Sequence, residues 1–353
     1  MSASARHAST TPRRDVVIVG AGPNGLTAAI VMARAGLSVS VLEANDAIGG
    51  GCRTESLTLP GYRHDVCAAI HPVALASPIF NHLGLTNHGV EWRSARYALA
   101  HPLDDGRAAI LSRRMAETTM SLGVDGPRWE RLVEPFVARH EAFFADTLRP
   151  IRMPRHPWLM LRFGMAGLES SRRAESRFAD APARALLAGC SAHSVLPLTA
   201  AGSASFGLVL AIAGHALDWP CAAGGSQAIV DALASLAAQA GCEIVTSTRV
   251  RTLRDIPASR AVLFDLTPRQ VAAIAGERCR PAIGDDSSGS DTDRASSRST
   301  TRWLDRSRGD RQPATRPQRS TSEAPLRRSR RRRPRRTRDA SATRRSCWRP
   351  SRA

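Results

Sequence analysis

The chain has 353 residues, 42% of them hydrophobic, and a formal net charge of +19 at pH 7, so it is long enough for two domains with buried cores. Seven cysteines, at positions 52, 67, 190, 221, 242, 279 and 347, show no CxxC pair or regular spacing, which argues against a structural zinc site and a disulfide framework and fits a reducing cytosol. No stretch reaches the ~20 apolar residues that span a bilayer, and residues 1–13 lack the apolar core of a secretory signal, so we expect a flexible lead there.

The first predicted element is a buried strand that leads into a glycine turn. Val16–Val19 is an unbroken run of β-branched residues, typical of a parallel strand covered on both faces. Gly20 then allows a tight turn, Gly22 lets the backbone approach a pyrophosphate, and Gly25 lets the next helix pack against the strand. The pattern predicts a dinucleotide-binding turn.

A helix and a second strand follow this turn. Residues 26–35 favour a helix that ends at Gly36, and its N-terminal N–H groups would hold phosphate oxygens. Val39–Leu42 predicts the next strand, and Glu43 at its end is placed to accept the ribose hydroxyls of an adenosine. A GxGxxG motif alone is weak evidence, but strand, turn, helix, strand and acid in this order predict a site for FAD or NAD.

The residues beyond Glu43 favour FAD. The segment Gly49-Gly50-Gly51-Cys-Arg53-Thr54 resembles the signature of the flavin amine oxidase and phytoene desaturase superfamily, which NAD enzymes do not usually carry. In that superfamily the second glycine pair passes close to the flavin's pyrophosphate and the following arginine contacts the cofactor. Here Gly51 stands where many members have the first arginine, and Arg53 stands two places later.

Further segments resemble the phytoene dehydrogenase-like branch of this superfamily, so the similarity covers about residues 14–277. They are Leu59-Pro-Gly-Tyr-Arg-His-Asp-Val-Cys-Ala-Ala-Ile-His-Pro72, Ala100-His-Pro-Leu-Asp-Asp-Gly-Arg107, Gly224-Gly-Ser-Gln-Ala-Ile229 and Asp265-Leu-Thr-Pro268. The resemblance implies FAD as cofactor and a backbone contact from Val250 to the adenine. The residues expected to bind FAD are Gly20, Gly22, Asn24, Gly25, Glu43, Gly50, Gly51, Arg53 and Val250.

The predicted fold is α/β: a Rossmann-like FAD-binding domain with a parallel sheet, interrupted by a mixed α+β substrate domain and followed by a disordered tail. The expected parts are a lead at 1–13, the FAD-binding domain at 14–95 and 220–277, the substrate domain at 96–219 and the tail at 278–353.

Within the expected substrate domain, residues 97–111 predict a hairpin around Asp104-Asp105-Gly106. Residues 128–216 have helical spacing with breaks at Pro150, Pro154, Pro157 and Pro197. The apolar run 206–214 fits either a buried core helix or the wall of a lipid-like tunnel.

The chain is then expected to return to the nucleotide-binding sheet. Residues 227–240 predict a helix, 243–253 a strand pair and 261–265 another strand of the same sheet.

Acid–base residues are not assigned. His64, Asp65, His71, His193 and His215 have no spacing that forces any two together, and a single histidine in an apolar region is more often a structural residue. Flavin chemistry needs little proton transfer from the protein, which mainly orients the substrate. His64-Asp65 is the strongest pair because it follows Arg53 closely, but the catalytic residues stay unknown. No metal is expected.

Residues 278–353 have a different composition. They contain 23 Arg and 8 acidic residues, which account for +15 of the net charge, and few aliphatic residues. Such a composition cannot bury a core, so we expect disorder. All 50 basic residues of the chain are Arg, as expected from a GC-rich gene. Back-translation in a shifted frame yields family-like segments, which favours a frameshift close to residues 278–280 over a selected nucleic-acid-binding tail.

The leading functional hypothesis is an FAD-dependent oxidoreductase that takes hydride from a hydrophobic, polyene or isoprenoid-like substrate to flavin N5. Its activity is expected to be impaired, because the family's segment that closes over the flavin is missing after residue 278. The alternatives are an NAD-binding dehydrogenase and a protein that binds nucleic acid or acidic surfaces through its arginine tail. We expect a cytoplasmic location, and peripheral membrane contact stays open. The substrate, electron acceptor and oligomeric state are not indicated.

Overall fold

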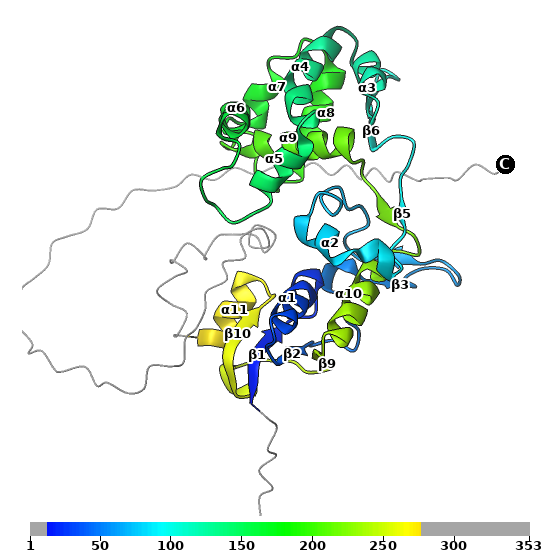
Figure 1. Cartoon of the computed structure of the whole chain (residues 1–353). Coiled ribbons are helices and arrows are strands. Elements are labelled where there is room, and N and C mark those ends of the chain that lie inside the picture. The colour runs from blue at the N-terminus through cyan, green and yellow to red at the C-terminus, as the bar shows by residue number, and fades with distance from the viewer. Residues whose placement is uncertain (1–12, 277–353) are drawn as a thin grey trace, which may run out of the picture. The chain divides into compact units, whose positions relative to one another are not determined.

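The strand predicted at residues 16–19 is central in a parallel sheet. In the computed structural model, which describes residues 13–276 (Figure 1), the strand order is β10-β1-β2-β9 and all three pairings are parallel. These strands are β1 (Arg14–Val19), β2 (Val39–Leu42), β9 (Glu243–Val245) and β10 (Ser259–Phe264). The predicted α/β Rossmann-like fold is confirmed.

Both faces of this sheet are covered, which explains the unbroken apolar run in β1. On one face Val16 and Ile18 pack with residues of α1 (Pro23–Arg34) and α10 (Gln227–Gln239). On the other face Val17 and Val19 pack with Leu42, Val250 and Ile256. Alternate residues of one strand therefore enter two separate cores.

The other short strands pair locally. They are β3 (Thr54–Glu55) with β4 (His64–Asp65), β5 (Trp92–Arg93) with β8 (Cys221–Ala222), and β6 (Leu99–Pro102) with β7 (Ala108–Leu111), all antiparallel. The β6–β7 pair confirms the predicted hairpin. The β5–β8 pair joins the chain before and after the segment expected to bind substrate.

That segment is mainly helical, as its spacing predicts. Its helices are α3 (Met115–Leu122), α4 (Gly126–Val137), α5 (His140–Thr147), α6 (Pro157–Gly167), α7 (Ser171–Glu175), α8 (Ala181–Ala192) and α9 (Ser203–Ala216), with the 3-10 turn η3 (Gly123–Asp125). The remaining elements are α2 (Pro78–Leu83), α11 (Pro268–Ala275) and the 3-10 turns η1 (Gly50–Cys52), η2 (Leu85–His88) and η4 (Leu253–Asp255). Pro157 begins α6, where its missing N–H costs nothing.

The helical segment has its own core, and α9 lies in it. Trp129, Phe136 and Phe143 are fully buried there, together with Leu208 and Ile212 of α9. The apolar run at 206–214 therefore forms a core helix, one of its two sequence interpretations.

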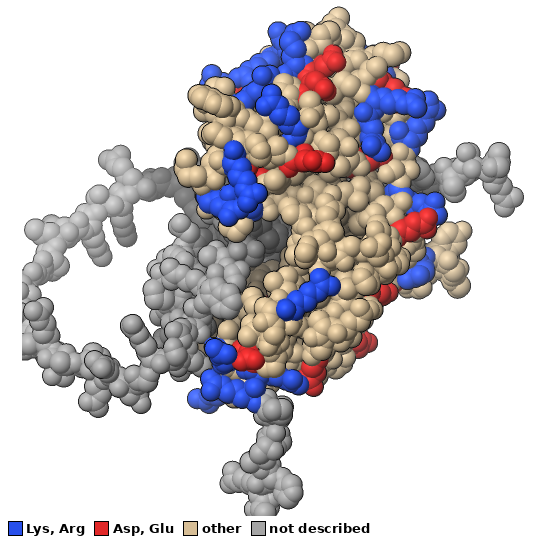
Figure 2. Space-filling model, in the orientation of Figure 1, with Lys and Arg blue, Asp and Glu red and all other residues tan. Residues whose placement is uncertain are grey.

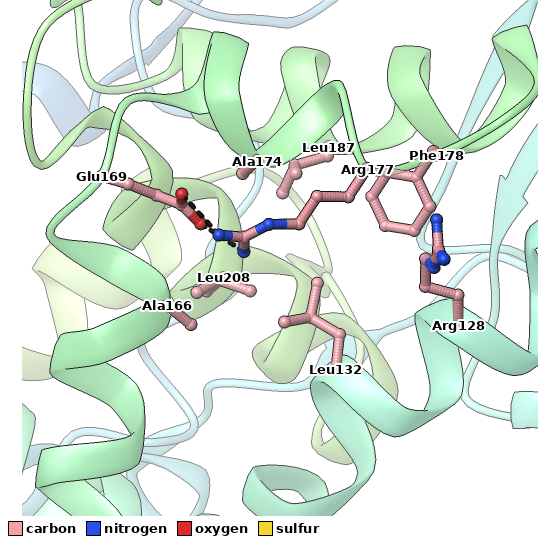
Figure 3. Close-up of a pocket in the computed structure, with 9 residues that line it drawn as sticks. All are labelled: Arg128, Leu132, Ala166, Glu169, Ala174, Arg177, Phe178, Leu187 and Leu208. Carbon is pink, nitrogen blue, oxygen red and sulfur yellow. Dashed lines mark hydrogen bonds and ion pairs between the residues drawn. The ribbon is translucent and has the colours of Figure 1, made fainter.

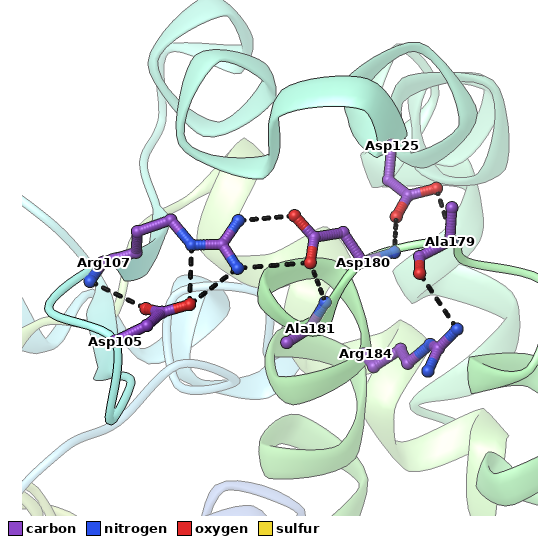
Figure 4. Close-up of polar contacts among 7 residues, drawn as sticks. All are labelled: Asp105, Arg107, Asp125, Ala179, Asp180, Ala181 and Arg184. Carbon is purple, nitrogen blue, oxygen red and sulfur yellow. Dashed lines mark hydrogen bonds and ion pairs between the residues drawn. The ribbon is translucent and has the colours of Figure 1, made fainter.

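A buried aspartate holds the entry to α8. Asp125, only 3% exposed, accepts hydrogen bonds from the backbone N–H groups of Ala179 (2.9 Å) and Asp180 (2.7 Å). Figure 4 shows that Asp180 also pairs with Arg107, which extends from the β6–β7 turn. The Arg107 pair is exposed and contributes little, whereas the Asp125 bonds satisfy the two N–H groups in a partly buried place.

One predicted element is wrong. Residues 243–253 form a single short strand, β9, instead of a strand pair. Ser247 has a left-handed backbone (φ 51°), and the N–H groups of Ser247 and Thr248 bond to the carbonyl oxygens of Asn45 and Glu43. A residue in that conformation ends a strand, so residues 246–250 form a loop along the end of β2.

The described residues carry nearly balanced charge. Residues 13–276 contain 26 Arg and 22 acidic residues, and Figure 2 shows the two signs interspersed on the visible face. The arginine-rich run, the expected disordered tail and the frameshift position lie outside the described residues, as do residues 1–12. None of the helices between residues 13 and 276 is both long and apolar enough to cross a membrane.

Candidate functional site

The glycine turn after β1 is packed so closely that side chains do not fit. Gly20 has φ 106°, and a Cβ added there would lie 2.5 Å from the carbonyl oxygen of Asp265. A Cβ added at Gly25 would overlap the carbonyl oxygen of Gly20 itself. Two of the three predicted glycines are thus required by contacts within the turn, which leaves the backbone bare at the start of α1.

Asp265 follows β10 and contacts this turn directly. Its Oδ2 accepts a hydrogen bond from the Gly25 N–H (2.8 Å), and a Cβ added at Gly22 would lie 2.8 Å from the same oxygen. Burial raises the pKa of Asp265, and the nearby Glu43 carboxylate raises it further. The sequence analysis assigned no role to Asp265, although its place at the end of a predicted strand of the same sheet was a usable signal.

Glu43 lies at the end of β2 and is 6% exposed. Its Oε2 accepts from the Ala21 N–H (2.8 Å), and its Oε1 accepts from the backbone N–H (3.0 Å) and side-chain amide (2.9 Å) of Asn45. A carboxylate has about four acceptor positions, so room for one more donor remains, such as a ribose hydroxyl. Asn45, which orients the carboxylate, was missed because an exposed asparagine in a loop has no distinctive pattern.

The second glycine segment lies on the first. The Gly49 N–H donates to the carbonyl oxygen of Ala21 (3.0 Å), and a Cβ added at Gly50, where φ is 54°, would lie 3.3 Å from the Cα of Gly22. At Gly51 an added Cβ would meet only the Cys67 side chain at ordinary contact distance (3.7 Å). The structure therefore requires glycine at Gly50 but would accept a side chain at Gly51.

Arg53 follows this segment and has an unsatisfied donor. Its side chain is 25% exposed, and its Nε is buried with no hydrogen-bond acceptor, although Glu55 Oε1 lies 3.3 Å away in an ion pair. A buried N–H without an acceptor is unfavourable. It is therefore a candidate contact for an anionic or carbonyl group of a bound molecule.

A polar network ties these segments to α10. The Thr54 hydroxyl donates to Asp65 Oδ1 (2.6 Å), which also accepts from the Ser226 N–H (2.8 Å), and the Gln227 N–H donates to Thr54 (3.0 Å). These bonds lower the pKa of Asp65 against the opposing effect of burial. His71 Nε2 lies 2.9 Å from the Ser226 hydroxyl, and burial lowers the pKa of its imidazole.

The remaining predicted cofactor residues have weaker geometric links. Asn24 is exposed in the first turn of α1. Val250 is 8% exposed in the core beside Val19 and Leu42, on the loop that runs along Glu43. The structure thus gathers Gly20, Gly22, Gly25, Glu43 and Gly50 closely, with the others around them, but the assignment of all nine to FAD stays a prediction.

The other titratable residues considered from sequence have structural partners. His64 bonds to Thr58 (2.7 Å), His193 packs edge-on against Trp219, and His215 accepts from the Trp129 indole N–H (3.0 Å). No catalytic residue emerges from these contacts. Within residues 13–276, no cluster of three or more His, Cys, Asp and Glu is arranged to hold a metal ion.

A cavity of about 60 Å³ lies elsewhere, among the helices (Figure 3). It is lined by Leu132, Phe178, Leu187 and Leu208, with the Arg177–Glu169 ion pair at its edge. Ligand pockets usually measure roughly 300–1,000 Å³, so this cavity is far too small for a polyene. None of the predicted cofactor residues lines it.

Comparison with known proteins places the dinucleotide turn in a family. Residues 18–83 match the model of an NAD(P)-binding Rossmann-like domain. The chain is 32% identical over 114 residues to a limonene dehydrogenase of Castellaniella defragrans, covering 32% of this chain and 20% of that protein. It is 56% identical over 52 residues to putrescine oxidase of Kocuria rosea, covering 15% and 10%.

Solved structures share the fold over a longer stretch. A mutant putrescine oxidase has a TM-score of 0.50 and 22% identity, covering 74% of this chain and 60% of that one. An oxidoreductase from Methanosarcina mazei has a TM-score of 0.52 and 17% identity, covering 77% and 62%. The chain therefore spans less than two thirds of these proteins; it contains an NAD(P)-binding Rossmann-like domain, and its relatives are oxidoreductases.

Proposed function

We propose that this protein is an FAD-dependent oxidoreductase of the dehydrogenase or desaturase type. The observation that carries the proposal is the group formed by the bare glycine turn, the buried Glu43 carboxylate and the second glycine segment lying on the turn. Glu43 would accept a ribose hydroxyl, and the start of α1 would hold the pyrophosphate through backbone N–H groups.

The second glycine segment favours FAD over NAD. A Rossmann turn with an acid at the end of the next strand suits either cofactor, but Gly49 and Gly50 add a second stretch of bare backbone beside Gly22. The buried Nε of Arg53 adds an unpaired donor nearby. FAD, when bound, accepts hydride at its N5, while the protein orients the substrate and excludes competing reactions.

The proposed substrate is a hydrophobic molecule of the polyene or isoprenoid class. Two observations support this class: the resemblance to phytoene dehydrogenase-like proteins and the similarity to a protein named as a limonene dehydrogenase. Limonene is an isoprenoid hydrocarbon. The expected effect of residues 278–353 on turnover stays a prediction, because these residues lie outside the described ones.

Replacement of Glu43 by glutamine tests the cofactor site. The amide nitrogen of glutamine cannot accept a hydrogen bond, so one of the donors that now bond to Glu43 would lose its acceptor. We expect FAD to bind about tenfold to a hundredfold more weakly, roughly 1.4–3 kcal/mol, in a fluorescence titration. The control is Glu91→Gln, an exposed acid in an ion pair with Arg93, which should bind like the parent. Equal affinity of Glu43→Gln and parent would contradict the assignment.

We further propose that the protein contacts a membrane surface through α6. Ile151, Met153, Trp158, Leu161, Met165 and Leu168 are all more than half exposed. The last four recur at helical spacing, so they form one outward stripe, while Leu159 of the same helix is buried. Residues 146–168 also contain four arginines against one acid. An apolar stripe among arginines suits an anionic lipid surface.

Vesicle binding tests this surface. The double variant Trp158→Ser/Leu161→Ser should reduce sedimentation with phosphatidylglycerol vesicles by about tenfold or more, because two large apolar side chains no longer enter the interface. The matched control is Met120→Ser/Val124→Ser, which removes two side chains of similar exposure from another part of the surface. Equal losses in both double variants would contradict the proposal, as would equal binding of the parent to neutral phosphatidylcholine vesicles.

A further inference from the structure

Two cysteines lie opposite each other beside the candidate cofactor site. The antiparallel pair β3–β4 places Thr54 opposite Asp65 and Glu55 opposite His64. The same register, continued toward the site, places Cys52 opposite Cys67. Hydrogen bonds on both sides show that the pairing does continue: the Val66 N–H donates to the Arg53 carbonyl oxygen, and the Ala68 N–H donates to that of Gly51, each at 2.9 Å.

This register puts the cysteines at a position suited to a disulfide. Hydrogen-bonded and non-hydrogen-bonded pairs alternate along an antiparallel ladder, so the pair between two bonded positions is a non-bonded one, with Cα atoms typically about 4.5 Å apart. Disulfides need Cα atoms about 4.4–6.8 Å apart. The Cys67 side chain also lies against residue 51, since a Cβ added at Gly51 would meet Cys67 Sγ at 3.7 Å.

We propose that Cys52 and Cys67 form a reversible cross-strand disulfide, which makes this pair a redox modification site next to the candidate cofactor residues. Both are free thiols in the structure. The link would close residues 53–66 into a loop and join the Gly50–Arg53 segment to Ala68, whose carbonyl oxygen accepts from Ser226 at the start of α10. It would therefore fix the backbone on both sides of Arg53.

The two cysteines have different roles in this reaction. Cys67 is exposed and reacts first, and its thiolate attacks one sulfur of a low-molecular-weight disulfide such as oxidised glutathione. One glutathione leaves as a thiolate and takes up a proton. Cys52, which is partly buried, then attacks the Cys67 sulfur of the mixed disulfide and releases the second glutathione. Two protein thiols are thereby oxidised by two electrons, and one glutathione disulfide is reduced to two thiols.

Peptide mapping tests the proposal on the whole protein. Trypsin cuts after Arg53 and Arg63, so the cysteines fall in separate peptides, residues 35–53 and 64–93. After incubation with oxidised glutathione and alkylation of the remaining thiols, we expect a species whose mass is the sum of these peptides less two hydrogens. Dithiothreitol should separate it into its parts.

Single variants define the expected loss. Cys52→Ser and Cys67→Ser should each abolish the linked species, whereas Cys221→Ser, a change in β8, should leave its yield unchanged. Circular dichroism confirms that each variant is folded. The proposal is overturned if the parent carries only a glutathione adduct on Cys67, or if Cys67 links to another cysteine. The assay needs no cofactor, so the link can form even if FAD fails to bind, and the two results separate this inference from the proposed function.

Discussion

Replacing Gly25 by alanine should abolish FAD binding and lower the free energy of unfolding by about 3 kcal/mol. The added methyl group would overlap the Gly20 carbonyl oxygen and lie 3.0 Å from Asp265 Oδ2. Neither neighbour can turn away, because the first is backbone and the second holds the Gly25 N–H. The turn must therefore open, and the bare backbone at the start of α1 is lost. Urea unfolding and an FAD titration measure the two effects.

Gly164 provides the matched control for this change. It lies within α6 with an ordinary helical backbone, and an added Cβ would meet only the Leu168 side chain at 3.9 Å. Alanine is the better helix former, so Gly164→Ala should stabilise the protein by about 0.5–1 kcal/mol and leave FAD binding unchanged. The same chemical change thus has opposite signs at the two positions. A Gly25→Ala protein that unfolds and binds FAD like the parent would refute this description of the turn.

Acidification below pH 6.5 should destabilise the protein through His215. This residue is 4% exposed, and burial lowers its pKa to about 4 even though the Ser112 backbone opposes the shift. An unfolded histidine titrates near pH 6.5, so the folded state favours the neutral ring. That contribution is fully present above pH 6.5 and is lost as the pH falls toward 4. It amounts to about 3 kcal/mol in total, of which about 2 kcal/mol is lost by pH 5.

A variant without a titrating ring isolates this effect. His215→Gln keeps an acceptor for the Trp129 indole N–H, so the variant should fold. Its free energy of unfolding should fall by about 2 kcal/mol less than that of the parent between pH 7 and pH 5. The other histidines, among them His71 and His101, stay in both proteins and cancel in the comparison. Parallel pH curves for parent and variant would show that His215 is not the group responsible.

The Rossmann part could be predicted because its signals are local. The β-branched run of β1, the glycines after it and Glu43 lie within 30 residues, and each has a separate physical reason. The helix α10 and the hairpin β6–β7 were also predictable from periodicity and turn residues. The strand pair at 243–253 was predicted wrongly, because propensity favours a strand there while Ser247 and Thr248 bond to the chain at Glu43 and Asn45.

What the sequence could not supply is contact between distant segments. Asp265 bonds to Gly25 although 240 residues separate them, and Thr54 bonds to Gln227 across 173 residues. Neither residue type is unusual where it stands, so its role appears only in three dimensions. The Cys52–Cys67 register likewise depends on the hydrogen bonds that extend β3–β4 beyond its two assigned pairs.

The measurement that tests the central claim most directly is a pair of titrations of the full purified chain, one with FAD and one with NAD, followed by calorimetry and visible absorbance. The glycine turn, Glu43 and the second glycine segment predict one FAD per chain, bound at least about tenfold more tightly than NAD, which corresponds to 1.4 kcal/mol. Tighter binding of NAD, or no binding of FAD by a folded chain, would contradict the account.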